Sequence, residues 1–306
     1  MTDTYHVPVM VREVIAYLSP SRGGLYFDGT VGGGGHAVAI LESSEGARLV
    51  GVDRDASALA ESERRLSAYA GRYRLVQADY AAAAASLDEP LSGALLDLGI
   101  SSHQVDETGR GFTFREGAPL DMRMGGASSA ERSAADLLNE ATESELAEIF
   151  REWGEERRSR RLAAEVVRRR GERPFETSDD LVAAMRRSLG RLSVQDKARI
   201  FQSLRIAVNR EIEALETALP VLRDRLEAEG VFVVLSYHSV EDRTVKTSFR
   251  EWSRSCVCPP ELPVCRCRGR ALGELLTRRA VVASAEEQAS NPRSRSARLR
   301  AWRKAA

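Results

Sequence analysis

The stretch that decides the fold is Phe27-Asp28-Gly29-Thr30-Val31-Gly32-Gly33-Gly34-Gly35-His36. It follows a short apolar run that predicts a strand, and it precedes a helix-like segment at residues 37–41. Glycine tolerates positive φ and lets the backbone approach a ligand closely. A turn of this kind between a strand and a helix is typical of a nucleotide-cofactor site at the helix N-terminus. A glycine-rich turn is weak evidence by itself, so its surroundings decide its meaning.

Further apolar runs at residues 48–52, 73–76 and 93–96 alternate with helix-like segments such as residues 56–69. This alternation predicts a parallel sheet built from βαβ units. An aspartate ends or follows each of the first four strands, namely Asp28, Asp53, Asp79 and Asp97. Because the carboxyl ends of parallel strands meet at one edge, we expect these acids to share the edge where ligands bind.

The four aspartates favour one cofactor class. Asp53 can accept hydrogen bonds from both ribose hydroxyls of an adenosine cofactor. S-adenosylmethionine has an ammonium and a sulfonium and no pyrophosphate, so carboxylates suit it better than they suit a nicotinamide dinucleotide. Any one aspartate could instead cap the following helix, which is common. Four aspartates at corresponding positions after four successive strands favour a class I methyltransferase. A nicotinamide oxidoreductase and a non-catalytic RNA-binding scaffold are kept as alternatives.

The pattern changes after the fourth strand. Residues 107–126 form an irregular, glycine-rich loop, and residues 131–198 show helical periodicity only. A long helix over residues 199–219, closed by Pro220, then leads to a fifth strand at residues 231–235. Later strands are expected at residues 277–283 and 297–302.

These patterns predict an α/β, Rossmann-like fold with an inserted all-helical domain. The expected parts are the first part of the core (1–106), the inserted helical domain with a role in RNA recognition (107–198), and the second part of the core with a basic C-terminal tail (199–306).

The formal net charge of zero conceals an asymmetry. Residues 1–150 carry 12 basic and 23 acidic side chains, whereas residues 151–306 carry 33 and 22. A basic half suggests a polyanionic partner such as RNA, although charge runs are usually solvated helix faces. The predicted phosphate contacts are Arg157, Arg158, Arg160, Arg161, Arg168, Arg169, Arg170, Arg293, Arg295, Arg298, Arg300, Arg303 and Lys304.

No apolar run reaches the roughly 18 residues that a membrane span needs, and no basic-then-apolar leader opens the chain. We therefore expect a cytoplasmic protein without a membrane partner. All four cysteines fall in one proline-rich loop, as Cys256, Cys258, Cys265 and Cys267. Four thiolates could hold a structural zinc, but the C-x-C spacing is less suited to one ion than C-x2-C. Reduced thiols without metal are the favoured interpretation, and zinc stays open.

Several motifs together resemble a known family, the bacterial 16S rRNA (cytosine-N4)-methyltransferases called RsmH or MraW. The motifs are Asp28-Gly29-Thr30 with Gly33-Gly34-Gly35-His36, Leu96-Asp97-Leu98-Gly99-Ile100-Ser101-Ser102-His103-Gln104, Arg110-Gly111-Phe112-Thr113-Phe114, Gly117-Ala118-Pro119-Leu120-Asp121-Met122-Arg123-Met124, Gly154-Glu155-Glu156-Arg157, Val208-Asn209-Arg210-Glu211, Ser236-Tyr237-His238-Ser239-Val240-Glu241-Asp242-Arg243 and Asn291-Pro292-Arg293-Ser294-Arg295-Ser296. They span nearly the whole chain.

The resemblance implies S-adenosylmethionine as methyl donor and the N4 amino group of a cytidine in the decoding region of 16S rRNA as acceptor, in free RNA or in the small ribosomal subunit. Carried over by motif, the cofactor contacts would be Gly34, Gly35, His36, Asp53 on the ribose, Tyr80 beside the adenine, and Asp97 and Gln104 near the methionine end. The family often has Phe at the position of Tyr80, which should preserve the ring contact. A homodimer is neither implied nor excluded.

The catalytic hypothesis centres on Asp97. With nearby backbone carbonyls, it would accept hydrogen bonds from the cytosine amino group, and Ser101, Ser102 or His103 would orient the base. Tyr237 could stack on the cytosine. His238 could accept a proton after transfer, although a lone histidine is more often a structural hydrogen-bonding residue.

Overall fold

The computed structural model describes residues 8–100, 107–126, 130–258 and 266–306. The chain divides into two compact units. The sheet unit comprises Met1–Gly99 and Ile212–Ala306, and the helical unit comprises Ile100–Glu211. Across the described ranges, no helix has both the length and the apolar character that a membrane crossing requires.

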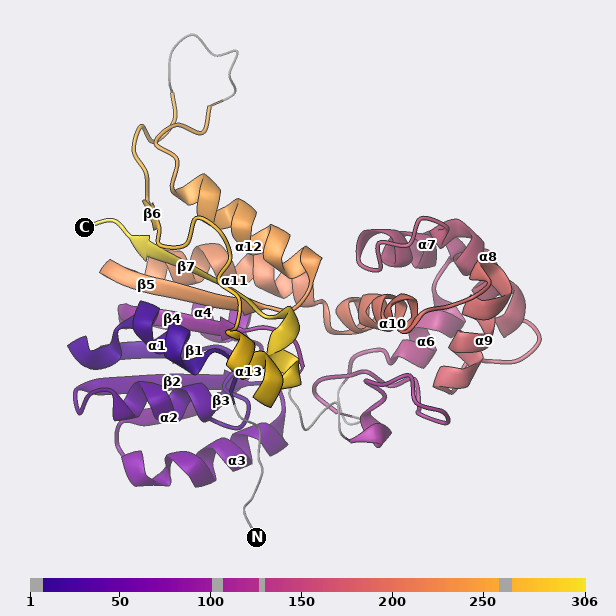
Figure 1. Ribbon diagram of the computed structural model, residues 1–306, viewed down its shortest axis with the longest axis horizontal. Helices are drawn as coiled ribbons and strands as arrows, with labels where there is room; N and C mark the ends of the chain where they lie inside the picture. Colours follow the sequence, from indigo (N-terminus) through magenta and orange to yellow (C-terminus); the bar gives the residue numbers. More distant parts are fainter. Residues whose placement is uncertain (1–7, 101–106, 127–129, 259–265) are drawn as a thin grey trace. The chain divides into compact units, whose positions relative to one another are not determined.

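The sheet unit contains a seven-stranded sheet in the order β3-β2-β1-β4-β5-β7-β6 (Figure 1). Strands β1 to β5 pair in parallel, and β7 lies antiparallel between β5 and β6. The strands are β1 (Gly24–Asp28), β2 (Ala47–Asp53), β3 (Tyr73–Gln77), β4 (Leu91–Asp97), β5 (Leu226–Ser236), β6 (Gly273–Leu275) and β7 (Arg298–Lys304). The predicted α/β sheet is confirmed. Its strand order reverses between β1 and β4, the point at which open α/β sheets bind ligands.

Helices cover both faces of this sheet because successive strand residues point to opposite sides. Leu25 and Phe27 of β1 enter one apolar core, and Tyr26 between them enters the other. The first core includes α4 (Tyr80–Ala85), α11 (Glu211–Arg225) and α12 (Ser239–Trp252), and the second includes α1 (Val11–Leu18), α2 (Gly35–Glu42) and the end of α3 (Ala56–Leu66). The described part of this unit also contains α13 (Ala285–Ser290), η1 (Pro20–Arg22), η2 (Ser67–Tyr69) and η4 (Pro292–Ser296).

The helical unit has a separate apolar core, in which Phe150, Phe175 and Met185 are fully buried. The helices among its described residues are η3 (Thr108–Arg110), α6 (Ala134–Glu140), α7 (Glu143–Glu152), α8 (Ser159–Arg170), α9 (Ser178–Leu189) and α10 (Val194–Asn209). Capping boxes begin α6, α7, α9 and α10, where a Ser or Thr and an acid three residues later exchange hydrogen bonds with each other's backbone N–H. The predicted helical insertion is thus present.

The prediction of one long helix over residues 199–219 is wrong. Helix α10 ends at Asn209, Arg210 adopts a left-handed conformation with φ of 52°, and α11 begins at Glu211. Helix α11 also continues through Pro220, because the buried Leu219 and Leu222 hold it against the sheet. The expected domain boundary at 198 and 199 therefore shifts to 211 and 212, since Phe201 and Leu204 of α10 belong to the helical core.

The last strands also differ from expectation. Residues 277–283 form no regular strand. Arg278 and Arg279 are both exposed, so side chains do not alternate there, and Val281 makes only an isolated bridge to Leu299. The strand at this edge is β6, with Gly273 opposite Lys304. The strand predicted at 297–302 is confirmed as β7.

The end of the basic tail is therefore part of the sheet, as strand β7. Arg300 is 7% exposed and makes a bidentate ion pair with Asp242, from Nε to Oδ1 at 2.7 Å and from Nη2 to Oδ2 at 3.0 Å. Arg303 pairs with Glu274. The prediction that the tail offers its charges to phosphate is wrong for Arg300, because its guanidinium is buried against a carboxylate.

Candidate functional site

Strands β1 and β4 lie side by side at the centre of the sheet (Figure 1), and each ends in an aspartate. Asp28 is 1% exposed. Its Oδ1 accepts a hydrogen bond from the Thr30 backbone N–H at 3.1 Å, but among the described residues its buried Oδ2 has no hydrogen-bond partner. An unpaired buried carboxylate oxygen is costly, so this atom suits a ligand that donates a hydrogen bond or carries positive charge.

The glycine-rich turn is shaped by Asp53. One oxygen of Asp53 accepts from Gly32 N–H at 3.0 Å, and the other accepts from Asp55 N–H at 2.9 Å. Gly32 and Gly34 have φ values of 50° and 79°. The predicted cofactor contact Asp53 thus also holds the turn to strand β2, and its remaining lone pairs can still accept ribose hydroxyls.

Two further predicted cofactor contacts, Gly35 and His36, stand at the end of the turn and have different surroundings. Gly35 begins α2, and a Cβ there would lie 2.7 Å from Cγ of Pro8, so packing explains this glycine. His36 is buried, and its Nε2 donates a hydrogen bond to the Val9 carbonyl oxygen at 2.9 Å. That bond leaves Nδ1 as the acceptor in the neutral ring, 3.7 Å from Oδ2 of Asp97. Burial lowers the pKa of His36, so the ring stays neutral at physiological pH.

Asp97 is held by contacts from two other segments of the sheet unit. The Tyr237 hydroxyl, just beyond β5, donates to Oδ1 at 2.7 Å, and the Asp97 N–H donates to Thr30 Oγ1 at 2.7 Å. Burial raises the pKa of Asp97 to about 7, although the Tyr237 hydrogen bond opposes this shift. Burial likewise raises the pKa of Asp28 to about 6. Both carboxyls therefore change charge near neutral pH.

His238 has a structural position. It is the N-cap of α12, where its Nδ1 accepts from the Glu241 N–H at 3.4 Å, and its Nε2 lies 3.0 Å from Glu241 Oε1. Glu241 Oε2 in turn accepts from the Tyr237 N–H at 2.9 Å. This geometry favours the structural interpretation of His238 over the proton-acceptor hypothesis. Glu241 was not among the predicted site residues, but the spacing His238-x-x-Glu241 is a capping-box signal that sequence alone carries.

The remaining predicted residues separate into two groups. Asp79 caps α4 by accepting from the Ala81 N–H at 2.8 Å, as the capping alternative supposed, and Tyr80 packs partly buried against the first core. Ser101, Ser102, His103 and Gln104 lie outside the described residues. Thr30 was missed, although it links Asp28 to Asp97.

The acids of this edge decide which ligand fits. Asp28, Asp53 and Asp97 present carboxylates around a glycine turn, and the nearby His36 is held neutral. These carboxylates can accept hydrogen bonds from ammonium and ribose hydroxyl groups and can attract a sulfonium, whereas a pyrophosphate would meet like charges. The residues present therefore fit S-adenosylmethionine better than a nicotinamide dinucleotide.

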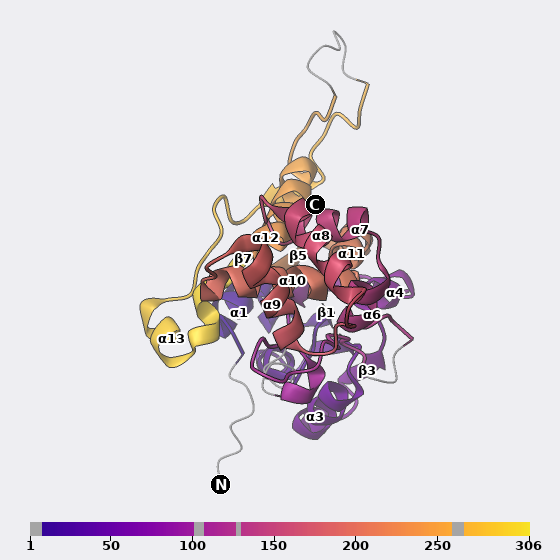
Figure 2. The same cartoon turned by 90° about the vertical axis from the view of Figure 1, so that its right-hand side faces the viewer.

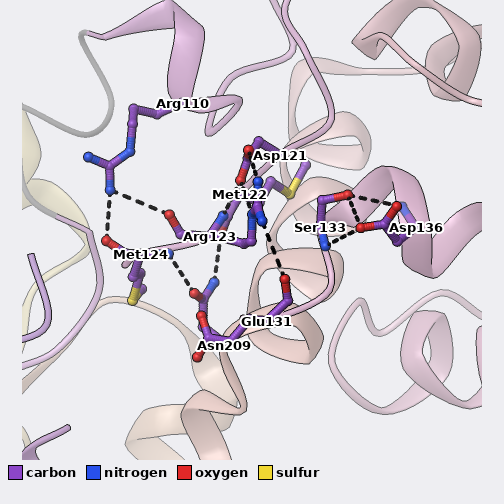
Figure 3. A network of polar contacts seen from close by, with 9 residues as sticks. All are labelled: Arg110, Asp121, Met122, Arg123, Met124, Glu131, Ser133, Asp136 and Asn209. Carbon is purple, nitrogen blue, oxygen red and sulfur yellow. Dashed lines mark hydrogen bonds and ion pairs between the residues drawn. The ribbon is translucent and has the colours of Figure 1, made fainter. Parts of the chain in front are cut away.

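In the helical unit, the segment around residues 110–124 is held by long-range polar contacts (Figure 3). Asn209 is 2% exposed, accepts from the Met124 N–H at 2.8 Å and donates to the Met122 carbonyl oxygen at 2.8 Å. Arg110 donates to the Met124 carbonyl oxygen at 2.7 Å. Asn209 thereby fixes Met122 in a left-handed conformation with φ of 62°. Two motifs that are far apart in the sequence thus form one structural feature.

Comparisons with known proteins agree with this geometry. A model of the MraW methylase family matches residues 3–305. The "Ribosomal RNA small subunit methyltransferase H" of Gemmatimonas aurantiaca is 54% identical over 310 residues, which cover 99% of this chain and 96% of the relative. The protein of the same name from Geotalea uraniireducens is 47% identical and covers 99% of this chain and 100% of the relative.

Among solved structures, a putative methyltransferase from Streptococcus mutans in complex with SAH is similar, with a TM-score of 0.44 and 10% identity over 98% of this chain and 99% of that chain. The family model and the two relatives each cover nearly all of the sequence, and the range that the family model matches contains both the glycine turn and the acids of the central edge. This chain belongs to the MraW methylase family.

Proposed function

We propose that this protein transfers the methyl group of S-adenosylmethionine to the N4 amino group of a cytidine in the decoding region of 16S rRNA. The single observation that carries the chemistry is the Asp97 carboxylate, which Tyr237 holds at the carboxyl edge beside the glycine turn. Family membership and the names of the relatives support the RNA substrate. The reaction would then take place where small ribosomal subunits are made, in the cytoplasm.

The acids of the carboxyl edge indicate which residues would hold each part of the cofactor. Asp53 would accept the ribose hydroxyls, Tyr80 would contact the adenine, and the unpaired Oδ2 of Asp28 with Asp97 would face the positively charged methionine end. When bound, S-adenosylmethionine supplies an electrophilic methyl group on a sulfonium. His36 would support this end through Nδ1, which is an acceptor in its neutral ring.

The acceptor nitrogen sets the task for the protein. The lone pair of a cytosine amino group is delocalised into the ring, so the nitrogen is a poor nucleophile. An ionised Asp97 that accepts a hydrogen bond from this amino group would localise the lone pair on nitrogen and stabilise the positive charge that develops there. The Tyr237 hydroxyl would keep the Asp97 carboxylate in place while the base binds.

The direct test is transfer of labelled methyl from S-adenosylmethionine to unmodified 16S rRNA and to small ribosomal subunits, followed by nucleoside analysis. The proposal expects label in N4-methylcytidine at a decoding-region position. Label at carbon 5 or on a ribose hydroxyl would contradict it, and so would absence of label with both substrates. Calorimetry with S-adenosylmethionine and with NAD tests the cofactor separately. RNA binding without affinity for S-adenosylmethionine would favour the scaffold alternative.

The helical unit offers the RNA contacts in this proposal. Arg157 lies just before α8, and Arg160 and Arg161 lie in its first turn. All three are exposed and take part in none of the ion pairs found among the described residues. By contrast, Arg168 at the other end of α8 pairs with Glu165 and Glu172. The first three guanidinium groups are therefore available to phosphate, whereas Arg168 would first have to give up its partners.

Replacing Arg157, Arg160 and Arg161 together with Ala is expected to weaken RNA binding, because three phosphate contacts are lost. The logarithmic salt dependence of binding should become shallower by about 2 to 3. Affinity for S-adenosylmethionine should not change. Filter binding across a salt series measures the slope, and Arg48→Ala with Arg64→Ala, two exposed and acid-paired arginines, is the matched control. An unchanged slope in the triple variant would show that these arginines only solubilise α8.

A further inference from the structure

The segment that joins α12 to β6 brings three cysteines together. Its two described arms, residues 253–258 and 266–272, run next to each other in both views (Figures 1 and 2). The base is closed by a hydrogen bond from the Leu272 N–H to the Trp252 carbonyl oxygen at 2.8 Å. The Arg268 guanidinium spans the arms by donating to the Arg254 carbonyl oxygen at 3.0 Å. The arms are thus held together at their base before the cysteines are considered.

The three sulfurs converge from both arms. The Sγ atoms of Cys256, Cys258 and Cys267 all lie within 4.8 Å of one another. Backbone N–H groups also cross between the arms to sulfur, from Val257 to Cys267 Sγ and from Arg266 to Cys258 Sγ, each at 3.4 Å. Hydrogen bonds of this kind stabilise negative charge on sulfur and orient it, as outer partners do around metal ligands.

We propose that Cys256, Cys258 and Cys267 bind a structural zinc ion as thiolates. Tetrahedral zinc with Zn–S distances of about 2.3 Å places its sulfurs about 3.8 Å apart, which the observed cluster can reach by small side-chain adjustments. A disulfide joins only two sulfurs and gives the third no reason to converge. Arg254, Arg266 and Arg268 on the arms offset the negative charge that three thiolates add to one divalent cation.

The location makes this ion structural. Helix α12 starts beside the carboxyl end of β5, near Tyr237, and runs back along the sheet, so the cysteine arms leave from its far end. The proposed methyl-transfer site lies at the carboxyl ends of the strands, at the opposite end of α12 from these arms. The fourth ligand position is not assigned, since the remaining cysteine, Cys265, lies outside the described residues. The proposal is independent of the proposed function and can fail or hold without it.

The first test measures bound metal. Full-length protein purified without chelator is expected to contain about one zinc per chain by elemental mass spectrometry. Cys256→Ser and Cys267→Ser should each lower this content at least tenfold, whereas Ser255→Ala, an exposed neighbour on the same arm, should leave it unchanged. Zinc content near zero in the wild type after incubation with zinc and gel filtration would overturn the proposal. Equal zinc in the wild type and both cysteine variants would also overturn it.

The second test identifies the metal ligands by cobalt absorption and measures how the metal protects the arms from trypsin. Cobalt in place of zinc should give the strong thiolate-to-metal absorption and the visible bands of a tetrahedral sulfur site, and Cys267→Ser should remove them. Chelation should speed tryptic cleavage at Arg254 and Arg266 at least tenfold, because the arms lose their cross-link. A thiol count in denaturant that rises only after reduction would show a disulfide in place of the metal and would refute the site.

Discussion

Asp97→Asn is expected to lower the rate of methyl transfer by about 10³-fold while the protein stays folded. The amide keeps the shape of the side chain and can still accept the Tyr237 hydrogen bond, but it removes the negative charge that the cytosine amino group needs. Single-turnover transfer of labelled methyl measures the rate, and calorimetry measures the affinity for S-adenosylmethionine. Full turnover with unaltered cofactor affinity would exclude Asp97 from both of its assigned roles.

The free energy of unfolding of Asp97→Asn shows whether a lost rate reflects lost chemistry or a disturbed fold. Burial raises the pKa of Asp97 to about 7, above its unfolded value. The native state therefore binds more protons than the unfolded state between about pH 4 and pH 7, so the contribution of this group to stability falls as pH rises through that window. Asn has no charge to desolvate. Urea unfolding at pH 8 should thus show Asp97→Asn at least as stable as the wild type, and a large loss of stability would contradict this.

The pH dependence of the reaction tests independently whether the ionised form of Asp97 is the active one. Activity of the wild type should rise with pH through about 7, because the ionised carboxyl is the active form. The Tyr237 hydrogen bond lowers the pKa of Asp97, so Tyr237→Phe should move this limb of the profile to higher pH. A structural role for Tyr237 alone would lower activity without moving the limb. His238→Gln should leave the limb in place, since His238 caps α12.

Asp242→Ala is expected to lower the free energy of unfolding of the sheet unit by about 3–5 kcal/mol. Asp242 and Arg300 are each 7% exposed, and the substitution leaves the Arg300 guanidinium buried without its bidentate partner. Urea unfolding followed by tryptophan fluorescence measures the change. In a Trp153→Phe background, only Trp252 and Trp302 emit, and both belong to the core of the sheet unit.

An exposed ion pair between β7 and β6 supplies the control for this prediction. Arg303 and Glu274 have side-chain exposures of 34% and 60%. Glu274→Ala should cost less than about 1 kcal/mol, because water screens the exposed pair and Arg303 keeps both solvent and Glu229, 3.4 Å away, once Glu274 is replaced. Equal losses in Asp242→Ala and Glu274→Ala would show that burial does not govern these ion pairs.

Part of the site was predictable because its signals are local. The alternation of Leu25, Tyr26 and Phe27 between the two cores is a property of consecutive residues, and so is the positive φ that Gly34 supplies after the strand. The capping signals at Asp79 and His238 are equally local, since each bonds within three residues. They mark helix starts, and the sequence alone does not separate a capping residue from a ligand contact.

The other part depends on contacts that only the folded chain makes. Asp97 and Tyr237 are separated by 140 positions, and they meet because β4 and β5 pair in a register that places Asp97 opposite Leu235. The sequence predicted Arg300 as a solvent-exposed tail residue, but in the folded chain strand β7 places it against Asp242.

From the sequence alone, strands β1 to β5 and the acids at the ends of the first four could be predicted, because these follow from residue type and short spacing. The family was indicated by the resemblance of several motifs. The tertiary structure decided which acid shapes the turn, which one is held beside Tyr237, and that the sulfurs of Cys256, Cys258 and Cys267 lie close together. Such roles depend on the distances and burial created when remote segments pack, and residue spacing carries no record of them.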